Sequence, residues 1–207
     1  MKSAKTSEGL GQELTALSMT VLLIFILAVG CGEQDPRLHR LFSRMVKQAD
    51  LPSGWFVAGG GVDDRDQPDK GILARWIEFR GVPESVYPTV LAIHWLIDYP
   101  DGDQARAAYE QAVTEEFPVS AWVWPEQVQI TSQADEFRLA CLERNVEIYS
   151  NLDERYRGSF FCRAVGRYGT TVSIIYANVF EDEWLTYADL QHLLEVSDAR
   201  MATGQSR

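Results

Sequence analysis

The sequence has few of the residues that build metal and catalytic centres. Its 207 residues include 3 cysteines and 3 histidines, with no Cys-x-x-Cys motif or Cys/His cluster. A structural zinc site is therefore not expected. The histidines His39, His94 and His192 lie far apart, and none belongs to a Gly-x-Ser-x-Gly nucleophile motif. These patterns predict no cofactor, no metal ion and no catalytic residue.

Two stretches that resemble ligand loops lack the required spacing. The three glycines at 59–61 are not followed by the Lys-Ser/Thr pair of a phosphate-binding loop. The acidic stretch at 63–69 places Pro68 and Arg75 where a calcium-binding EF-hand needs oxygen ligands. We expect these stretches to form one mobile loop between two strands.

Basic residues are also scarce. The chain has 19 Lys and Arg residues against 30 Asp and Glu residues, which gives a net charge of -11. After residue 30 the lysines are Lys47 and Lys70. A chain this acidic has no basic stripe to displace counterions from phosphates, so nucleic acid and anionic lipid headgroups are not expected as partners.

No apolar run is long enough to cross a bilayer as a helix. The run at 19–29 has about 11 residues, whereas a spanning helix needs roughly 20. Its length is typical of the hydrophobic region of a secretory signal, and Lys2 and Lys5 supply the positive start.

The run ends in Leu27-Ala28-Val29-Gly30-Cys31, which resembles the signal of bacterial lipoproteins. The resemblance implies cleavage after residue 30 and attachment of acyl chains such as palmitate to Cys31. Two chains would hold the protein firmly on the extracytoplasmic face of the cell membrane. An ordinary signal peptide with an incidental cysteine, or an uncleaved anchor, are the alternatives.

This hypothesis divides the chain into four parts. Residues 1–30 are the signal peptide, 31–36 a lipidated tether, 37–201 a single domain, and 202–207 a disordered tail. A domain of this length is large enough to bury a sizeable core.

The order of predicted elements indicates an α+β fold. We expect a mainly antiparallel sheet with an N-terminal, a central and a C-terminal helix packed on it. The apolar stripe of the first helix faces either the core or the bilayer. The central helix begins at Asp103, and the last is opened by a capping box of Thr186 and Asp189. The expected ranges are a helix at 38–49, a hairpin of strands at 55–57 and 72–79, a central strand at 89–99, and short strands at 126–130, 136–142, 145–149, 159–165 and 170–179.

Cys141 and Cys162 lie in two strand-like runs that can pair with each other. Because an exported chain passes through compartments where thiols oxidise, we predict a disulfide bond between them. Two buried free cysteines are the alternative.

Trp122 and Trp124 stand two residues apart between the central helix and a strand. In an extended segment both side chains face the same way, so they are candidates to line an apolar or sugar-binding groove, or to contact a partner protein. Packing in the core is the alternative.

Several short motifs resemble a group of bacterial exported domains that includes PsbP-like proteins and the extracytoplasmic sensor domains of mycobacterial serine/threonine kinases. The resemblance implies a binding or sensing module and no enzymatic activity. We therefore predict a membrane-anchored domain that binds a small ligand or an envelope protein. An accessory subunit of an envelope enzyme and a hydrolase with dispersed catalytic residues are the alternatives. The motifs are Leu51-Pro52-Ser53-Gly54-Trp55, Asp103-Gln104-Ala105 and Val172-Ser173-Ile174.

Overall fold

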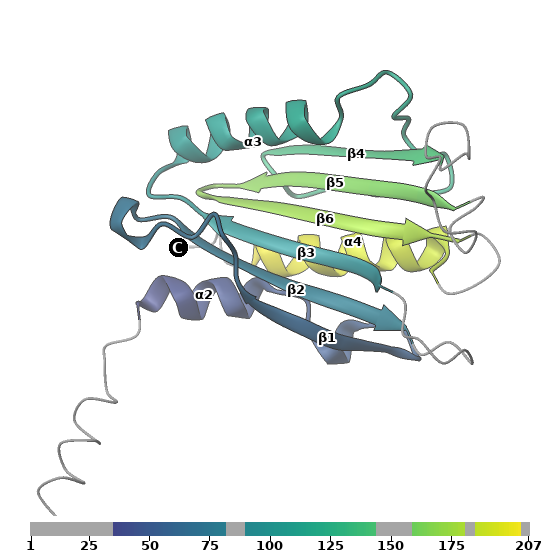
Figure 1. Ribbon diagram of the computed structural model, residues 1–207, viewed down its shortest axis with the longest axis horizontal. Helices are drawn as coiled ribbons and strands as arrows, with labels where there is room; N and C mark the ends of the chain where they lie inside the picture. Colours follow the sequence, from purple (N-terminus) through teal and green to yellow (C-terminus); the bar gives the residue numbers. More distant parts are fainter. Residues whose placement is uncertain (1–34, 82–89, 144–158, 181–184, 204–207) are drawn as a thin grey trace, which may run out of the picture. The chain divides into compact units, whose positions relative to one another are not determined.

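A six-stranded antiparallel sheet in the order β1-β2-β3-β6-β5-β4 organises the chain (Figure 1). The computed structural model describes residues 35–81, 90–143, 159–180 and 185–203. Within these ranges the sheet and three α-helices confirm the predicted α+β class. The strands are β1 (Trp55–Val62), β2 (Leu73–Gly81), β3 (Val90–Asp98), β4 (Glu136–Glu143), β5 (Phe160–Tyr168) and β6 (Thr171–Val179). The helices are α2 (Pro36–Arg44), α3 (Gly102–Glu116) and α4 (Tyr187–Ala202).

The sheet consists of two three-stranded meanders joined at one seam. Strands β1 to β3 follow one another in sequence, as do β4 to β6, and the seam is the pairing of β3 with β6. The almost continuous apolar run at 89–99 predicts a central strand, and β3 does lie between two neighbours. Gly169, with φ of 64°, makes the predicted tight turn between β5 and β6.

The helices cover the two faces of the sheet unequally. Side chains alternate along β3, so that Leu96 packs in a cluster with residues of α2 and α4, whereas Ile97 packs in the cluster under α3. On its own face, α3 lies over β5 and β6. The β1–β3 part of this face carries the half-buried side chains Trp76 and Trp95. Helix α3 therefore does not cover the β1–β3 part of this face.

The last two helices begin with capping aspartate or threonine residues. Thr186 and Asp189 form the predicted capping box of α4. The cap of α3 is Asp101 rather than Asp103, since Asp101 accepts a hydrogen bond of 2.8 Å from the backbone nitrogen of Gln104. Helix α4 runs to Ala202, so the predicted tail overlaps the last helical residue, and 204–207 lie outside the described residues.

Strand β1 corrects the prediction of a mobile loop at 59–61. The three glycines belong to the strand, and Gly61 pairs with Trp76 of β2. A Cβ atom at Gly60 would stand 3.0 Å from the backbone oxygen of Trp76, so glycine at this position lets the edge strand lie close to β2. Of the two short strands expected at 126–130 and 145–149, the first is absent and the second is not tested. Residues 126–130 form a turn and irregular chain, and 145–149 lie outside the described residues.

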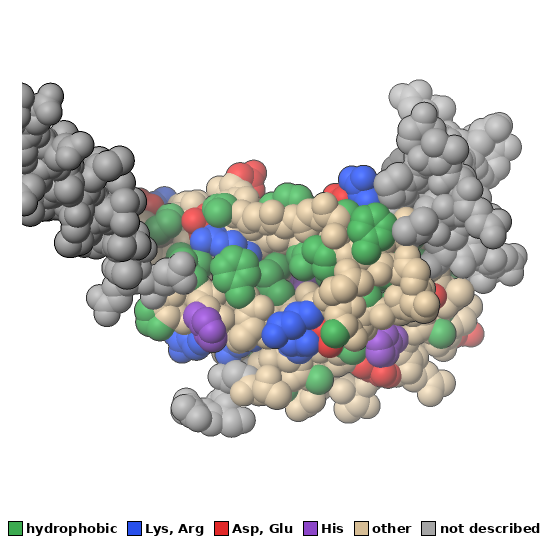
Figure 2. Space-filling model, turned by 90° about the horizontal axis from the view of Figure 1, so that it is seen from below, with side chains coloured by type: hydrophobic (Ala, Val, Ile, Leu, Met, Phe, Trp, Pro, Cys, Tyr) green, Lys and Arg blue, Asp and Glu red, His purple; other side chains and the backbone are tan. Residues whose placement is uncertain are grey.

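Helix α2 is shorter than the predicted helix at 38–49. It ends at Arg44, and a 3₁₀ turn follows at Gln48–Asp50. Leu41 and Met45, on the apolar stripe, are 1% and 5% exposed, so the stripe faces the sheet. Basic and histidine side chains occupy part of the face that Figure 2 shows from below.

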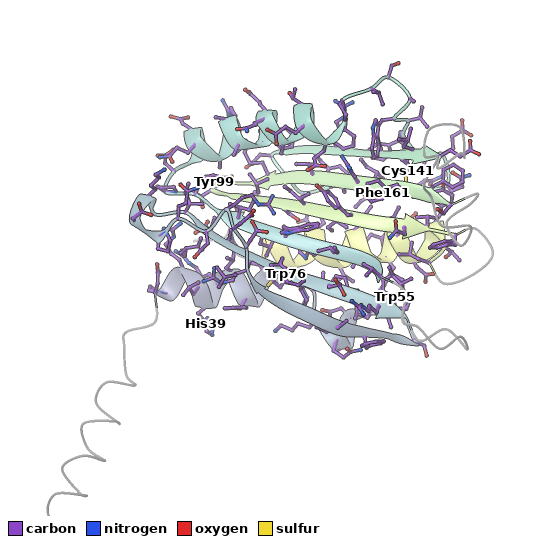
Figure 3. All side chains as sticks on the ribbon, in the orientation of Figure 1. His39, Trp55, Trp76, Tyr99, Cys141 and Phe161 are labelled. Atoms are coloured by element: carbon purple, nitrogen blue, oxygen red, sulfur yellow. A yellow bond between two sulfur atoms is a disulfide. The ribbon has the colours of Figure 1, made fainter. Side chains whose placement is uncertain are left out.

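The predicted disulfide bond is present. Cys141 of β4 and Cys162 of β5 are direct partners in the antiparallel register, and their sulfur atoms are bonded. The bond closes a segment with a sequence separation of 21 residues. In the chain-entropy model a loop of this length stabilises the fold by about 3 kcal/mol. Cys141 lies at the β4 end of the sheet in Figure 3.

Candidate ligand-binding site

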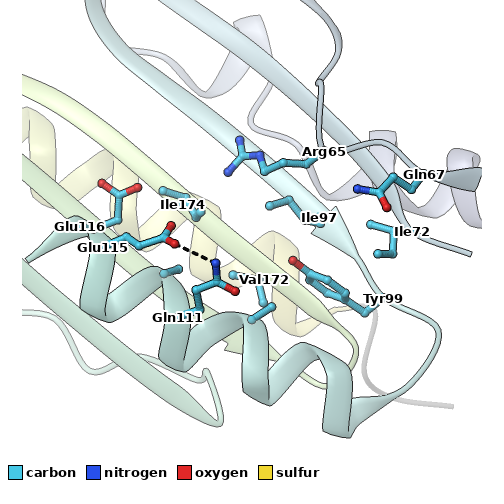
Figure 4. A pocket seen from close by; sticks show the side chains of 12 residues that line it. Arg65, Gln67, Ile72, Ile97, Tyr99, Gln111, Glu115, Glu116, Val172 and Ile174 are labelled. Atoms are coloured by element: carbon cyan, nitrogen blue, oxygen red, sulfur yellow. Dashed lines mark hydrogen bonds between the residues drawn. The ribbon is translucent and has the colours of Figure 1, made fainter. Parts of the chain in front are cut away.

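A cavity of about 280 Å³ lies between α3, the central strands and the loop after β1 (Figure 4). We call it the α3 cavity. Its apolar residues are Ile72, Ile97, Ala108, Ala112, Val172 and Ile174. Its polar residues are Arg65, Gln67, Tyr99, Gln111, Glu115 and Glu116. Half of the lining residues are polar, so the cavity combines an apolar floor with several groups that can orient a ligand.

Small side chains on α3 create the space. Ala108 and Ala112 are four residues apart, so they lie on the same side of the helix and both line the cavity. Opposite them, Ile97 of β3 and Val172 and Ile174 of β6 form the floor. Alanine fills little of the gap between helix and sheet, so a space remains above the floor, whose residues Ile97, Val172 and Ile174 are themselves only 2%, 1% and 3% exposed.

Arg65 forms one end of the cavity and is held by an ion pair. Its Nε donates to Asp63 Oδ1 at 2.5 Å, and its guanidinium lies 5.7 Å from the ring centre of Trp95. Partial burial opposes ionisation of Asp63, but the hydrogen bonds from Arg65 outweigh it and lower the pKa of this carboxyl to about 2. The charge of Arg65 is therefore already neutralised within the protein.

Glu116 forms the other end and is held by two partners. Arg163 Nη1 donates to Glu116 Oε2 at 2.7 Å, and the hydroxyl of Tyr176 donates to Glu116 Oε1. Burial, followed by the hydrogen bond to Glu116, raises the pKa of Tyr176. This hydroxyl therefore stays protonated and continues to donate.

Arg163 also joins three aromatic rings. Its guanidinium carbon lies 4.9 Å from the ring centre of Trp122, 4.7 Å from that of Phe161 and 5.0 Å from that of Tyr176. Contacts of this kind are cation–π interactions. Arg163 thus connects the wall of the cavity to the aromatic side chains of β5, β6 and the segment after α3.

An aromatic strip continues from the cavity across the uncovered part of the sheet. It consists of Trp76, Trp95, Tyr176 and Phe161, all half-buried. Trp76 and Trp95 are direct neighbours across β2 and β3, the rings of Trp95 and Tyr176 are 4.6 Å apart, and those of Tyr176 and Phe161 are 5.6 Å apart. Figure 3 labels Trp76 and Phe161, on β2 and β5. The strip extends the apolar surface of the cavity along one face of the sheet.

The chain is similar to a solved structure, whereas the comparisons of its sequence found no match. No protein-family model and no curated protein matches it. The extracellular domain of PknH from Mycobacterium tuberculosis is similar, with a TM-score of 0.49 and 8% identity, over 81% of this chain and 95% of that chain. At this identity the likeness concerns the fold alone.

The structure separates Trp122 from Trp124, which corrects the expectation that they face the same way. Trp122 is 9% exposed and packs with Phe117 and Phe161 in the cluster under α3. Trp124 is 46% exposed and lies against Phe137, which packs on the cluster of the other sheet face. The two indoles do not form a common groove, because 122–124 is not a regular strand.

His94 is buried on the face opposite the α3 cavity. It is 0% exposed, and its Nε2 lies 3.0 Å from Ser173 Oγ. Asp98, on the same strand face, binds Arg37, Thr170 and Thr171. A cleft with clustered carboxylates, or with His94 at its base, would support the hydrolase alternative, and of these two the imidazole of His94 has no access to solvent.

Lowering the pH is expected to destabilise the protein through His94. Burial lowers the pKa of His94 to about 3, so the folded state keeps it neutral where the unfolded chain, with a pKa near 6.5, binds a proton. The stabilisation is fully present above pH ~6.5 and is lost by about 1.4 kcal/mol per pH unit as the pH falls below that value.

Urea unfolding between pH 4.5 and 8 would measure this effect, with His94→Gln as the comparison. The variant lacks the titrating group, so its free energy of unfolding should depend less steeply on pH. Equal slopes for the two proteins would show that His94 is not held neutral by burial.

The described ranges contain no group of three or more residues able to hold a metal ion. In the acidic loop, Asp63 binds Arg65 and Asp66 binds Arg75 at 2.8 Å, so both carboxylates serve as ion-pair partners. Across the same ranges, no helix is both long and apolar enough to cross a membrane.

Proposed function

We propose that this chain is an extracytoplasmic lipoprotein whose domain binds a small, mainly apolar ligand in the α3 cavity. The observation that carries the proposal is the cavity itself, with its floor of Ile97, Val172 and Ile174 and its rim of polar side chains. Burial of ligand surface on such a floor supplies affinity, and the rim fixes orientation.

The charges at the rim favour a neutral or singly positive ligand. Arg65 is neutralised by Asp63, and Glu116 by Arg163. Glu115 accepts a hydrogen bond of 2.7 Å from the neutral amide of Gln111, so its negative charge remains. An anionic ligand would meet this charge, whereas the amides of Gln67 and Gln111 suit a neutral polar group.

Membrane attachment in this proposal depends on Cys31. The short apolar run, the small residues before the cysteine and the two early lysines support cleavage after residue 30 and acylation of the thiol. Residues 31–36 would then be the tether and 37–201 the ligand-binding domain.

Filling the cavity is expected to abolish binding of an apolar probe. Phenylalanine at position 112 would occupy the space that alanine leaves under α3. We expect N-phenyl-1-naphthylamine, a neutral fluorescent probe, to bind the wild-type protein and to bind Ala112→Phe at least about tenfold more weakly. Fluorescence titration measures both affinities.

Ala107→Phe is the matched control, because Ala107 is exposed on the same helix and does not line the cavity. This variant should bind the probe as the wild type does. If Ala112→Phe and wild type bind equally well while both remain folded, the cavity is not the binding site.

A protein partner is the second candidate. Val119, Val123 and Trp124, close together after α3, are 53%, 61% and 46% exposed, which favours contact with another protein. Native mass spectrometry of the full-length protein distinguishes the candidates. A retained small molecule supports the cavity, and a retained protein supports the accessory-subunit alternative.

A further inference from the structure

We propose that the outward side of α2 rests on an anionic lipid bilayer. We use the name α2 surface for this side of the helix, with the exposed residues His39, Arg40, Phe42 and Ser43, together with the exposed Lys47 in the turn that follows. The inference rests on the proposed acylation of Cys31 and adds a second contact, made by side chains, to the same membrane.

The local charge around α2 is opposite to that of the whole chain. Residues 35–50 contain three arginines and one lysine against Asp35 and Asp50, so the segment is net positive within a chain of net charge -11. The overall charge predicts poor affinity for anionic headgroups, but electrostatic attraction acts over about 8 Å at physiological ionic strength. The charge of α2 therefore decides what this side of the domain attracts.

Two of these basic residues attach the helix to the sheet. Arg37 Nε donates to Asp98 Oδ2 at 2.8 Å, and Arg44 donates to the hydroxyl of Thr171 at 2.8 Å. Leu41 and Met45 are buried beside them, at 1% and 5% exposure. Together these contacts fix which side of α2 faces outward.

Arg40 and Lys47 are the charges left on that outward side. Among the described residues, neither side chain has an ion-pair partner within 4 Å. Asp50 pairs with Arg200 Nη2 at 2.5 Å, and the charge of Lys47 also acts on the same carboxylate without forming an ion pair. Arg40 and Lys47 therefore remain available for phosphate groups outside the protein.

An exposed aromatic ring also lies on α2, and because Phe42 follows Arg40 by two residues, its ring leaves the helix on the opposite flank from the guanidinium. Phe42 is 54% exposed, although it is the largest apolar side chain of the helix. A phenylalanine flanked by arginine and lysine matches the composition of helices that lie in the membrane interface, where the ring enters the headgroup region and the cations bind anionic lipid. On the face seen from below, Figure 2 shows basic, acidic and histidine side chains with apolar ones between them.

The length of the tether favours the bilayer over an acidic protein as the occupant. Arg37 follows Cys31 by six residues, and a chain of six residues spans at most about 20 Å when fully extended. An acylated Cys31 would therefore hold the first turn of α2 within about 20 Å of the lipid in every conformation of the tether.

Labelling of Lys47 tests the inference on the full chain, expressed with its own leader and reconstituted in vesicles. Phosphatidylcholine vesicles with and without 30% phosphatidylglycerol are compared, and acetylation of Lys47 by an amine-reactive ester is followed by mass spectrometry. We expect acetylation about fivefold slower on the anionic vesicles, and the difference should disappear at high salt.

Two arginine variants make the test specific. Arg40→Glu should remove most of the protection of Lys47 on anionic vesicles. Arg106→Glu, at an exposed arginine of α3, should leave it unchanged.

The outcomes separate this inference from the proposed anchor. Equal labelling of Lys47 on both vesicle types, in protein that sediments with both, overturns the inference alone. Protein that carries no acyl chain and stays in the supernatant overturns the anchor and the inference together. Protection that appears only after an envelope extract is added assigns the surface to a protein partner and also overturns it.

Discussion

Replacing Cys31 by alanine is expected to move the protein from the membrane fraction to the soluble fraction. Each buried CH₂ group of an acyl chain contributes about 0.8 kcal/mol to membrane binding, and two chains make attachment effectively permanent. The side chains of α2 alone add too few charges to replace them. Fractionation and the intact mass of the protein would measure both the location and the lost lipid.

Gly32→Ala is the control, because it alters the neighbouring residue and keeps the thiol. This variant should remain in the membrane fraction with its acyl mass. If Cys31→Ala stayed in the membrane fraction with the mass of the wild type, the chain would be held by something other than acylation of this cysteine.

Removing the side chain of Arg163 is expected to cost about 3 kcal/mol of stability or more. Arg163→Ala leaves the carboxylate of Glu116, with a side chain 14% exposed, without its cation. The same change removes the cation that three aromatic rings share. Urea unfolding should show a lower midpoint, and probe binding should weaken because Glu116 forms one end of the cavity.

Arg138→Ala is a matched comparison on the neighbouring strand. Arg138 lies 4.6 Å from the ring centre of Phe117 and is exposed, so its loss should cost less than about 1 kcal/mol. Arg163→Lys should fall between the two, because an ammonium group cannot reproduce the planar guanidinium contacts. A stability of Arg163→Ala within about 0.5 kcal/mol of the wild type would contradict the central role of this residue.

Most of the sheet can be predicted from the sequence because its signals are local. The apolar run of β3, the glycine turn between β5 and β6 and the capping box of α4 each depend on neighbouring residues. The prediction for the glycines at 59–61 is wrong because their structure depends on a contact that is distant in sequence. Glycine favours loops on average, but here the backbone of Trp76, more than ten residues away in sequence, lies close to the edge strand at Gly60.

The candidate site is much harder to predict. Its ends, Arg65 and Glu116, and its floor residue Ile174 come from three distant parts of the chain, and only the fold brings them together. The local signal is the spacing of Ala108 and Ala112 on the inner side of α3, which marks a place where helix and sheet leave space. The prediction for Trp122 and Trp124 assumed an extended segment, and the irregular chain there sends the two rings to different clusters.

The seam between β3 and β6 has a consequence for export. It joins Ala92 to Ala177 and Asp98 to Thr171, so the two meanders meet only through residues far apart in the sequence. Contacts of such long range require a large loop to close before they stabilise anything. A chain that crosses a membrane from its N-terminus therefore emerges with β1 to β3 unable to complete their sheet. During that interval the apolar strand β3 lacks one of its two partners, β6.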